Sequence, residues 1–120
     1  MLVLVGTAFL AVAQPAGDPQ RGEALYSRCI ACHSIERDRT GPRHEGLLGR
    51  RIGSVPGFDY SPALRRAGSA GRVWDEVTLD RFLESPLRMF PGTRMTYAGV
   101  KDAQERADLI SYLKQAGATP

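Results

Sequence analysis

The residues with the clearest chemical potential form one short stretch, Cys29-Ile30-Ala31-Cys32-His33. A CxxCH pentad can hold a haem covalently through two thioether bonds while its histidine ligates the iron. On a helix, side chains at i, i+3 and i+4 share one face, so both thiols and the imidazole point to the same side. The stretch therefore predicts one haem c, attached through Cys29 and Cys32 and ligated by His33.

Two other chemistries use the same residue types. A zinc site would place adjacent Cys32 and His33 on one tetrahedral ion, where they would crowd each other, and the only other Cys or His are Cys29 and His44. A thiol-disulfide redox pair needs a βαβ context, and nothing around the pentad is typical of one. Zinc and a redox dithiol remain the alternatives to a haem.

Length and charge set the outer limits. A chain of 120 residues with 42% hydrophobic and 24% charged residues predicts one ordinary globular domain. So small a domain has little core of its own, and a haem would supply a large apolar surface. The net charge of +3 is modest, and no basic run interleaves with aromatic residues. Nucleic acid is therefore not expected as a partner.

The first residues are typical of an export signal. Residues 1–14 carry no charge, and Ala11-Val12-Ala13 offers the small residues that precede a cleavage site. The apolar run is short for a membrane span. We expect a signal peptide at 1–13, a linker at 14–17, a domain at 18–117 and a periplasmic location. Because a positively charged start is missing, an uncleaved apolar anchor stays the alternative.

Three helices are expected to position the pentad. Asp18-Pro19 is typical of an N-cap followed by proline at the first helical position. The first helix then carries an apolar stripe at helical spacing through Gly22, Leu25, Tyr26, Cys29 and His33.

The other two expected helices lie in the second half of the chain. One starts at Asp75, ends at Ser85-Pro86 and buries Leu79, Phe82 and Leu83. The other starts at Asp102 with a capping box to Glu105 and ends before Gly117. Residues 34–72 show little periodicity, which predicts a long irregular segment wrapped around a prosthetic group.

Further motifs follow the pentad in order, between about Gly17 and Lys114. They are Thr40-Gly41-Pro42, Gly46-Leu47-Leu48-Gly49-Arg50, Pro56-Gly57-Phe58-Asp59-Tyr60-Ser61, Trp74, Pro91-Gly92-Thr93-Arg94-Met95 and Asp108-Leu109-Ile110-Ser111-Tyr112-Leu113. On these motifs the chain resembles class I cytochrome c of the mitochondrial-like bacterial kind. The resemblance implies an all-α, small cytochrome c fold, with three main helices and long loops wrapped around one covalently bound haem.

The resemblance also implies a role for each matching residue. Cys29 and Cys32 match the thioether sites, and His33 and Met95 match the proximal and distal iron ligands. The Pro42 carbonyl matches the acceptor of the proximal imidazole N–H, a bond that fixes the tautomer. A buried haem propionate needs donors, and the positions that surround it match Arg50, Tyr60, Ser61, Trp74 and Thr93.

Some residues depart from the family pattern or compete with it. His44 stands where the family usually has an apolar residue, and we expect a surface or partly exposed histidine there rather than an iron ligand. Without the resemblance, Met95 would be core filler as readily as a ligand, and Met89 is its rival.

The implied function is one-electron transfer, not enzyme catalysis, because iron bound by His and Met has no open position for a substrate. We expect a monomer that reaches a membrane only through its partners or an uncleaved N-terminal segment. The implied partners are a bc-type quinol oxidoreductase and an oxidase, reaction centre or periplasmic dehydrogenase. They would dock on a basic rim of Arg28, Arg39, Arg88, Arg94 and Lys101.

Two other functions stay open. If Met95 is not a ligand, the protein would be a peroxidase or a gas-binding haem protein. Alternatively, it could be a haem subunit fixed to a larger redox complex.

Overall fold

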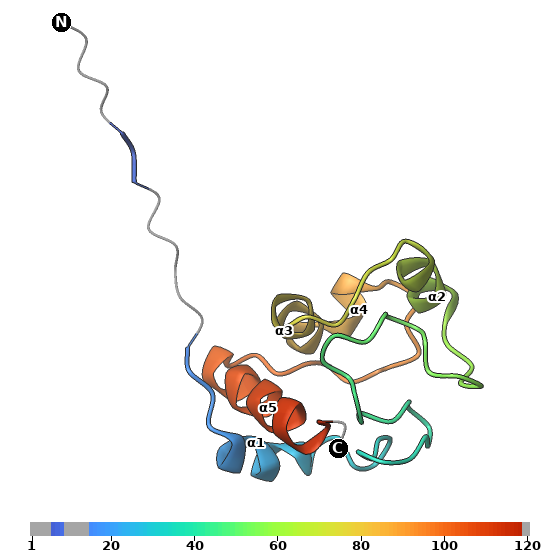
Figure 1. Cartoon of the computed structure of the whole chain (residues 1–120), viewed down its shortest axis with the longest axis horizontal. Coiled ribbons are helices and arrows are strands. Elements are labelled where there is room, and N and C mark those ends of the chain that lie inside the picture. Colours follow the sequence, from blue (N-terminus) through green and yellow to red (C-terminus); the bar gives the residue numbers. More distant parts are fainter. Residues whose placement is uncertain (1–5, 9–14, 119–120) are drawn as a thin grey trace, which may run out of the picture.

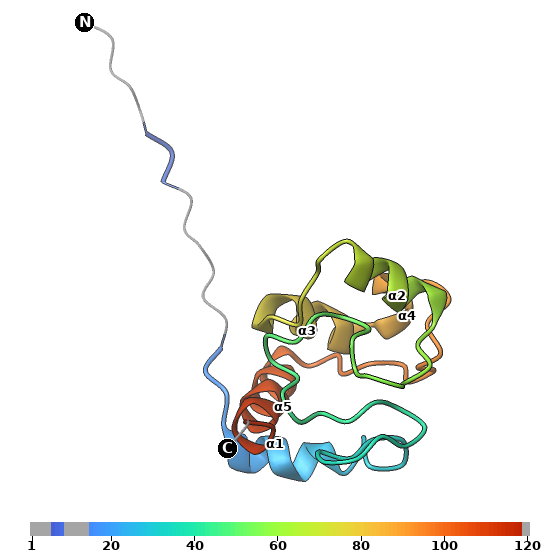
Figure 2. The ribbon, with the colours of Figure 1, turned by 45° about the vertical axis from the view of Figure 1, so that its right-hand side comes forward.

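The computed structural model describes residues 6–8 and 15–118, where the regular structure is helical. Its helices are α1 (Pro19–Tyr26), α2 (Pro62–Ser69), α3 (Glu76–Glu84), α4 (Pro86–Met89) and α5 (Ala103–Ala116). Figures 1 and 2 show α1 and α5 side by side at one end of the molecule and α2, α3 and α4 at the other, with the segment after α1 forming one side. None of the described helices combines the length and apolar character that crossing a membrane requires.

The predicted helix starts at Asp18, Asp75 and Asp102 are confirmed. Each aspartate accepts a hydrogen bond from a backbone N–H of the first turn: 2.8 Å from Gln20, 2.7 Å from Thr78 and 2.9 Å from Glu105. Such caps satisfy amides that have no partner inside the helix. The buried face of α3 is also as predicted, with Leu79, Phe82 and Leu83 all buried.

The first helix is shorter than predicted, because α1 ends at Tyr26. The Ser27 hydroxyl donates to the Ala24 carbonyl at 2.8 Å, an alternative partner that competes with helix continuation. The pentad follows in tight turns, in which the His33 N–H donates to the Cys29 carbonyl at 2.9 Å. These turns, rather than a helix, place the pentad, and the prediction of a helix through His33 was wrong.

The prediction that residues 34–72 lack regular structure was also wrong, since α2 lies inside this range. Ser61 caps α2 by accepting from the Leu64 N–H at 3.3 Å, and Pro62 takes its first position. Gly68 lets the helix approach the neighbouring chain, because a Cβ there would lie 2.1 Å from the Ile52 carbonyl oxygen. The short α4 was likewise not predicted, and Ser85 both ends α3 and caps α4.

The first and last of the described helices meet where α1 crosses α5. A Cβ on Gly22 would lie 2.0 Å from the Asp108 carbonyl oxygen, so only glycine permits this close approach. The Asp108 side chain, 4% exposed, accepts from the Asp18 N–H at 2.8 Å and from Arg21 Nε at 3.1 Å. Most of the predicted signal peptide lies outside the described residues, and its cleavage stays a prediction.

Candidate haem-binding site

The His33 imidazole is held by backbone atoms on two of its edges. Its Nδ1 lies 2.8 Å from the Pro42 carbonyl oxygen. A carbonyl only accepts, so Nδ1 donates and Nε2 keeps a lone pair for a metal. Gly41 lies so close that a Cβ on it would come within 2.2 Å of His33 Cε1. Burial lowers the pKa of His33, although the hydrogen bond to Pro42 acts in the opposite direction. The lowered pKa favours the neutral imidazole, which is the form that binds metals.

The two thiols of the pentad are both available for covalent attachment. Neither Cys29 nor Cys32 is in a disulfide; Cys29 is half-buried and Cys32 exposed. Burial raises the pKa of Cys29, which the nearby Arg28 partly offsets. The Cys32 carbonyl accepts a hydrogen bond from the Gly41 N–H at 2.7 Å. This bond joins the pentad to Gly41 and Pro42, the residues that contact the His33 ring. The thiols therefore fit two thioether bonds.

Met95, the predicted distal ligand, lies in the loop between α4 and α5. It is half-buried and packs against the hydrophobic core, and its N–H donates to the Thr93 hydroxyl at 3.4 Å. Met89 on α4 is also half-buried against the same core. Burial therefore does not separate the two methionines, and the assignment of Met95 stays a prediction from the family motif.

Three of the five predicted propionate neighbours come together. Trp74 and Arg50 are joined through their backbones, since the Trp74 N–H donates to the Arg50 carbonyl at 2.8 Å. Arg50 is half-buried, and its Nη2 donates to the Arg43 carbonyl at 2.8 Å and the Glu45 carbonyl at 2.5 Å. Tyr60 is buried beside it, and burial raises the pKa of its hydroxyl while the Val55 N–H and Arg50 oppose the rise. This side of the site offers a cation and a phenol to an anionic group.

The remaining two predicted neighbours have structural roles in the described chain. Ser61 is 2% exposed and caps α2, and Thr93 accepts from the Met95 amide. Burial lowers the pKa of Arg50, an effect that Tyr60 opposes, so the half-buried guanidinium is suited to an anionic partner. The roles of all five residues toward a propionate stay predictions.

Sequence reasoning missed a contact between Tyr26 and His44. The Tyr26 hydroxyl lies 2.9 Å from His44 Nδ1, and the His44 ring stacks on His33 with centroids 4.2 Å apart and planes 22° apart. His44 is partly exposed, as predicted, but its ring lies between the Tyr26 hydroxyl and the His33 ring. Burial, with His33 and Arg50 nearby, lowers the pKa of His44 to about 3. Sequence spacing carries no signal for this contact, because the partners come from separate segments.

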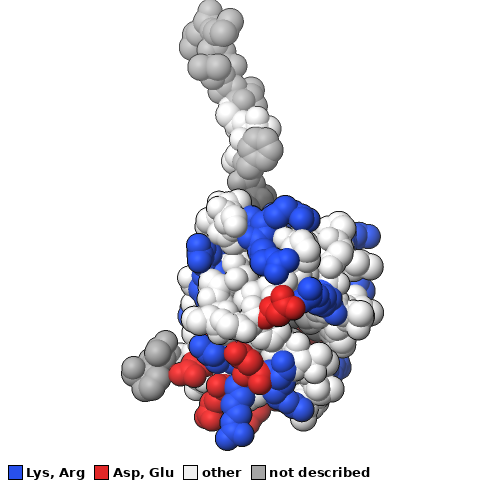
Figure 3. Space-filling model, turned by 90° about the vertical axis from the view of Figure 1, so that its right-hand side faces the viewer, with Lys and Arg blue, Asp and Glu red and all other residues white. Residues whose placement is uncertain are grey.

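The predicted basic rim is only partly free in the structure. Arg28 pairs with Glu105 at 3.0 Å and Arg94 with Asp59 at 3.2 Å. Lys101 donates to two backbone carbonyls, at 2.6 and 2.9 Å, and Arg39 donates to the Ile30 carbonyl. On the face in Figure 3, basic side chains lie at the top and the edges and also next to the acidic ones, most of which gather at the lower end. Positive charge is therefore present but locally neutralised in places.

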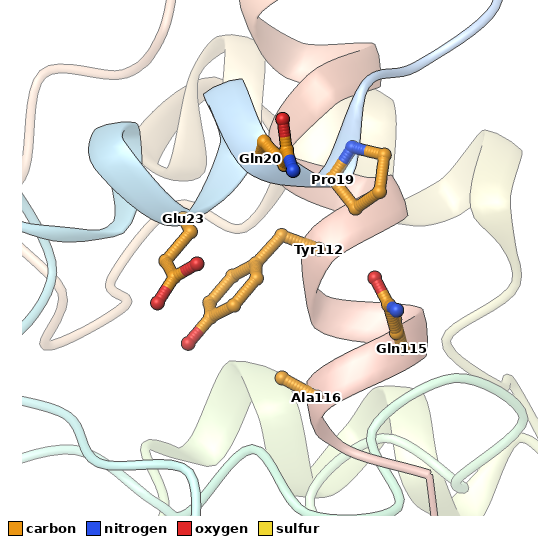
Figure 4. A pocket seen from close by; sticks show the side chains of 6 residues that line it. All are labelled: Pro19, Gln20, Glu23, Tyr112, Gln115 and Ala116. Carbon is orange, nitrogen blue, oxygen red and sulfur yellow. The ribbon is translucent and has the colours of Figure 1, made fainter.

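A hollow of about 260 Å³ lies between α1 and α5, away from the pentad. Figure 4 shows the Tyr112 ring extending from α5 toward Glu23 on α1. The lining residues are Pro19, Gln20, Glu23, Tyr112, Gln115 and Ala116. It contains none of the predicted site residues and is not part of the haem site.

Comparison with known proteins decides the family. A family profile described as Cytochrome c matches residues 19–117. The chain belongs to the cytochrome c family. This cytochrome is 40% identical to cytochrome c2 of Rhodomicrobium vannielii over 117 residues, covering 93% of this chain and 91% of that protein. It is 45% identical to cytochrome c 2.1 of Caenorhabditis elegans, covering 83% and 90%. The fold matches cytochrome cH from Methylobacterium extorquens with a TM-score of 0.77 at 35% identity, covering 82% and 99%.

Membership of this family confirms several predictions at once. The fold is the small all-α cytochrome c fold, and the cofactor is haem c bound covalently through Cys29 and Cys32. The function is electron transport rather than enzyme catalysis. The local structure fits this cofactor, since two free thiols and an imidazole with a free Nε2 lie together in the turns after α1.

Proposed function

We propose that this cytochrome carries single electrons between periplasmic redox proteins, with His33 and Met95 as the axial ligands of its haem. The hydrogen bond from His33 Nδ1 to Pro42, 2.8 Å, carries the proposal, because it presents Nε2 as a ligand. When bound, the haem supplies a one-electron couple, and a thioether ligand favours its reduced form. Ligands on both faces leave no open position for a substrate.

The chain's own residues support this task by holding charge and excluding water. Arg50 and Tyr60 offer donors to a propionate, so a buried negative charge has partners. Trp74, Phe82 and Phe90 form a buried aromatic cluster, with Trp74 and Phe82 centroids 4.9 Å apart. A rigid, dry surrounding limits the rearrangement of solvent when the charge of the centre changes.

The contacts of Ala16 and Asp18 agree with the proposed cleavage after Ala13. The Ala16 carbonyl accepts from Gln104 Nε2 at 2.7 Å, and the Asp18 N–H donates to Asp108 at 2.8 Å. The folded part therefore begins close behind the proposed cleavage site, with 14–17 as a linker to a domain at 18–117. Two of its bacterial relatives, from Rhodomicrobium vannielii and Agrobacterium tumefaciens, are cytochromes c2.

The proposed partners are a bc-type quinol oxidoreductase as donor and an oxidase, reaction centre or periplasmic dehydrogenase as acceptor. The proposed docking surface is the basic rim of Arg28, Arg39, Arg88, Arg94 and Lys101. Within the described chain, Arg88 is exposed and makes no ion pair, while Arg28 and Arg94 have acidic partners. Rim charges chiefly steer encounter, which suits a monomeric carrier that binds briefly.

Absorption spectra of the purified protein in both oxidation states test the ligand assignment. We expect bands of a thioether-linked, six-coordinate haem and a ferric charge-transfer band that is typical of a methionine sulfur on iron. A five-coordinate ferric spectrum, or immediate binding of peroxide or carbon monoxide, would contradict the carrier and favour the peroxidase or gas-binding alternative.

A further inference from the structure

Tyr26, which is buried, and His44, which is partly exposed, form a polar pair next to the proximal ligand. The Tyr26 side chain is 6% exposed, and its hydroxyl lies 2.9 Å from His44 Nδ1. In the described chain, no buried side-chain nitrogen or oxygen lacks a hydrogen-bond partner. Each member of the pair therefore depends on the other, because burying a polar group without a partner costs about 1–3 kcal/mol in typical cases.

The hydrogen bond fixes the His44 ring whichever way it runs. The Tyr26 hydroxyl can donate to His44 Nδ1 or accept from it, depending on the His44 tautomer. The His44 ring stacks on His33, with the two planes 22° apart. The His44 ring is thus fixed at one edge, with its face against His33.

His33 is then constrained from three directions. The Pro42 carbonyl fixes Nδ1 at 2.8 Å, the backbone of Gly41 closes on Cε1, and the His44 ring covers one face at 4.2 Å. The first two constraints hold the edge of the imidazole. Of these three contacts, the stacked ring is the one on the face of the imidazole, so it opposes a tilt or rotation that keeps the Pro42 bond intact.

The anchor of His44 is itself rigid. Tyr26 lies at the end of α1, and α1 is locked to α5 by the close approach at Gly22. The Tyr112 ring from α5 packs on Tyr26, with centroids 5.3 Å apart. The helix crossing is therefore connected to the proximal ligand through one phenol and one imidazole.

We propose that His44, held by the Tyr26 hydroxyl, is a positioning residue that fixes the plane of the proximal imidazole. An apolar residue at position 44 would fill the space but could not be fixed by a hydrogen bond. The inference rests on haem attachment and His33 ligation, but on no particular redox partner.

A double-variant cycle tests this proposal on the haem-loaded protein. The variants are Tyr26→Phe, His44→Leu and their combination, and the measurement is the proton NMR spectrum of the ferric form. The haem methyl shifts report the orientation of the axial imidazole, because its plane directs the unpaired spin. We expect Tyr26→Phe to change the spread of these shifts in the natural background and to change nothing further in the His44→Leu background.

Tyr112→Phe is the matched control, since it removes a phenol hydroxyl that contacts neither His44 nor His33. We expect its methyl shifts to equal those of the natural protein. The proposal is overturned if Tyr26→Phe leaves the shifts unchanged, if it shifts them equally in both backgrounds, or if Tyr112→Phe has the same effect. A lowered Tm with unchanged shifts would show a purely structural role and equally overturn it. If His44→Leu does not accumulate as holoprotein, His44→Met, which likewise lacks the imidazole nitrogen, supplies the second background.

Discussion

The proximal segment, residues 29–50, and the distal segment, residues 91–99, hold their predicted iron ligands in different ways. On the proximal segment, His33 has a backbone acceptor, a close glycine and a stacked ring. On the distal segment, Met95 is linked to Thr93 by a 3.4 Å hydrogen bond and is otherwise packed against the core. The protein thus orients His33 by its own contacts, while Met95 would depend more on the bond to iron that we propose for it. The difference predicts that the distal ligand is the one that exchanges.

Removing the haem attachment should abolish the framework that both segments share. We expect Cys29→Ser with Cys32→Ser to lose all covalent haem and to leave an unfolded or degraded apoprotein, because the loops have little core of their own. Haem staining of denatured protein and circular dichroism check this. A folded, haem-free double variant would show that the segments hold themselves without the cofactor.

The distal segment should respond strongly to loss of its ligand. Met95→Ala is expected to turn the ferric spectrum into a weak-field form that binds imidazole or cyanide readily. Met89→Ala is the control, because that side chain is equally half-buried against the core. Titration with imidazole, followed by absorption, measures both. Reversed outcomes would transfer the ligand role to Met89.

The proximal segment should respond to a change in space rather than in chemistry. Gly41→Ala would place a Cβ 2.2 Å from His33 Cε1, so the imidazole or the backbone must move. We expect a loss of about 1–3 kcal/mol in the free energy of unfolding, typical of overpacking. Denaturant unfolding measures this loss of stability. Thr40→Ala is the control, because Thr40 is the exposed neighbour of Gly41. An unchanged stability would mean that the proximal segment is as pliable as the distal one.

Acid should weaken the helix crossing that supports the proximal segment. Burial would raise the pKa of Asp108, but donors from Asp18, Gln104 and Arg21 outweigh it and lower the pKa. The unfolded state then binds more protons, so this carboxylate stabilises the fold above about pH 4, its ordinary pKa. The contribution is lost as the pH falls through the lower, folded-state pKa.

Asp108→Asn measures that contribution. We expect a lower Tm than the natural protein at pH 7, and a difference that shrinks as the pH falls toward 3. Glu76→Gln is the control, because Glu76 pairs with Lys114 of α5 at 3.2 Å but is 60% exposed. Exposed pairs contribute about 0–1 kcal/mol, so its Tm should change little. A Tm difference independent of pH would exclude the Asp108 carboxylate as the titrating group.

The smallest expected effect is on docking. Arg28→Glu with Arg94→Glu should slow electron transfer to an acidic partner at low salt, with the difference shrinking beyond about 0.1 M, where charges are screened over about 10 Å. Lys114→Glu is a control outside the proposed rim. Stopped-flow kinetics across ionic strength measure both. Equal slowing by the control, or rates independent of salt, would remove the rim as a docking surface.

The sequence predicted the elements that have strong local signals. Asp18, Asp75 and Asp102 marked three helices through a capping aspartate, a signal that acts within one turn. Ser61-Pro62 carries the same kind of signal as Asp18-Pro19, and α2 places Ala63, Leu64 and Ala67 against the core. This apolar face is only two turns long and consists mostly of small residues, so its periodicity was overlooked.

The site was predictable only as far as motifs extend. The pentad and the family motifs name the ligands and haem neighbours, and the Pro42 contact agrees with them. The stacking of His44 on His33 depends on the turn that brings two segments together, and no spacing rule contains that information. Burial could not separate Met95 from Met89, since both are half-buried on the same core.

The close crossing at Gly22 also determines when this chain can fold. The packing partner of α1 is α5, the last of the described helices, so an emerging chain lacks the surface that α1 needs until α5 has been synthesised. Contacts between such distant segments must close a long loop before they gain any stability, which delays them. The packing of α1 therefore follows the synthesis of α5, and the cysteines next to α1 remain accessible until then.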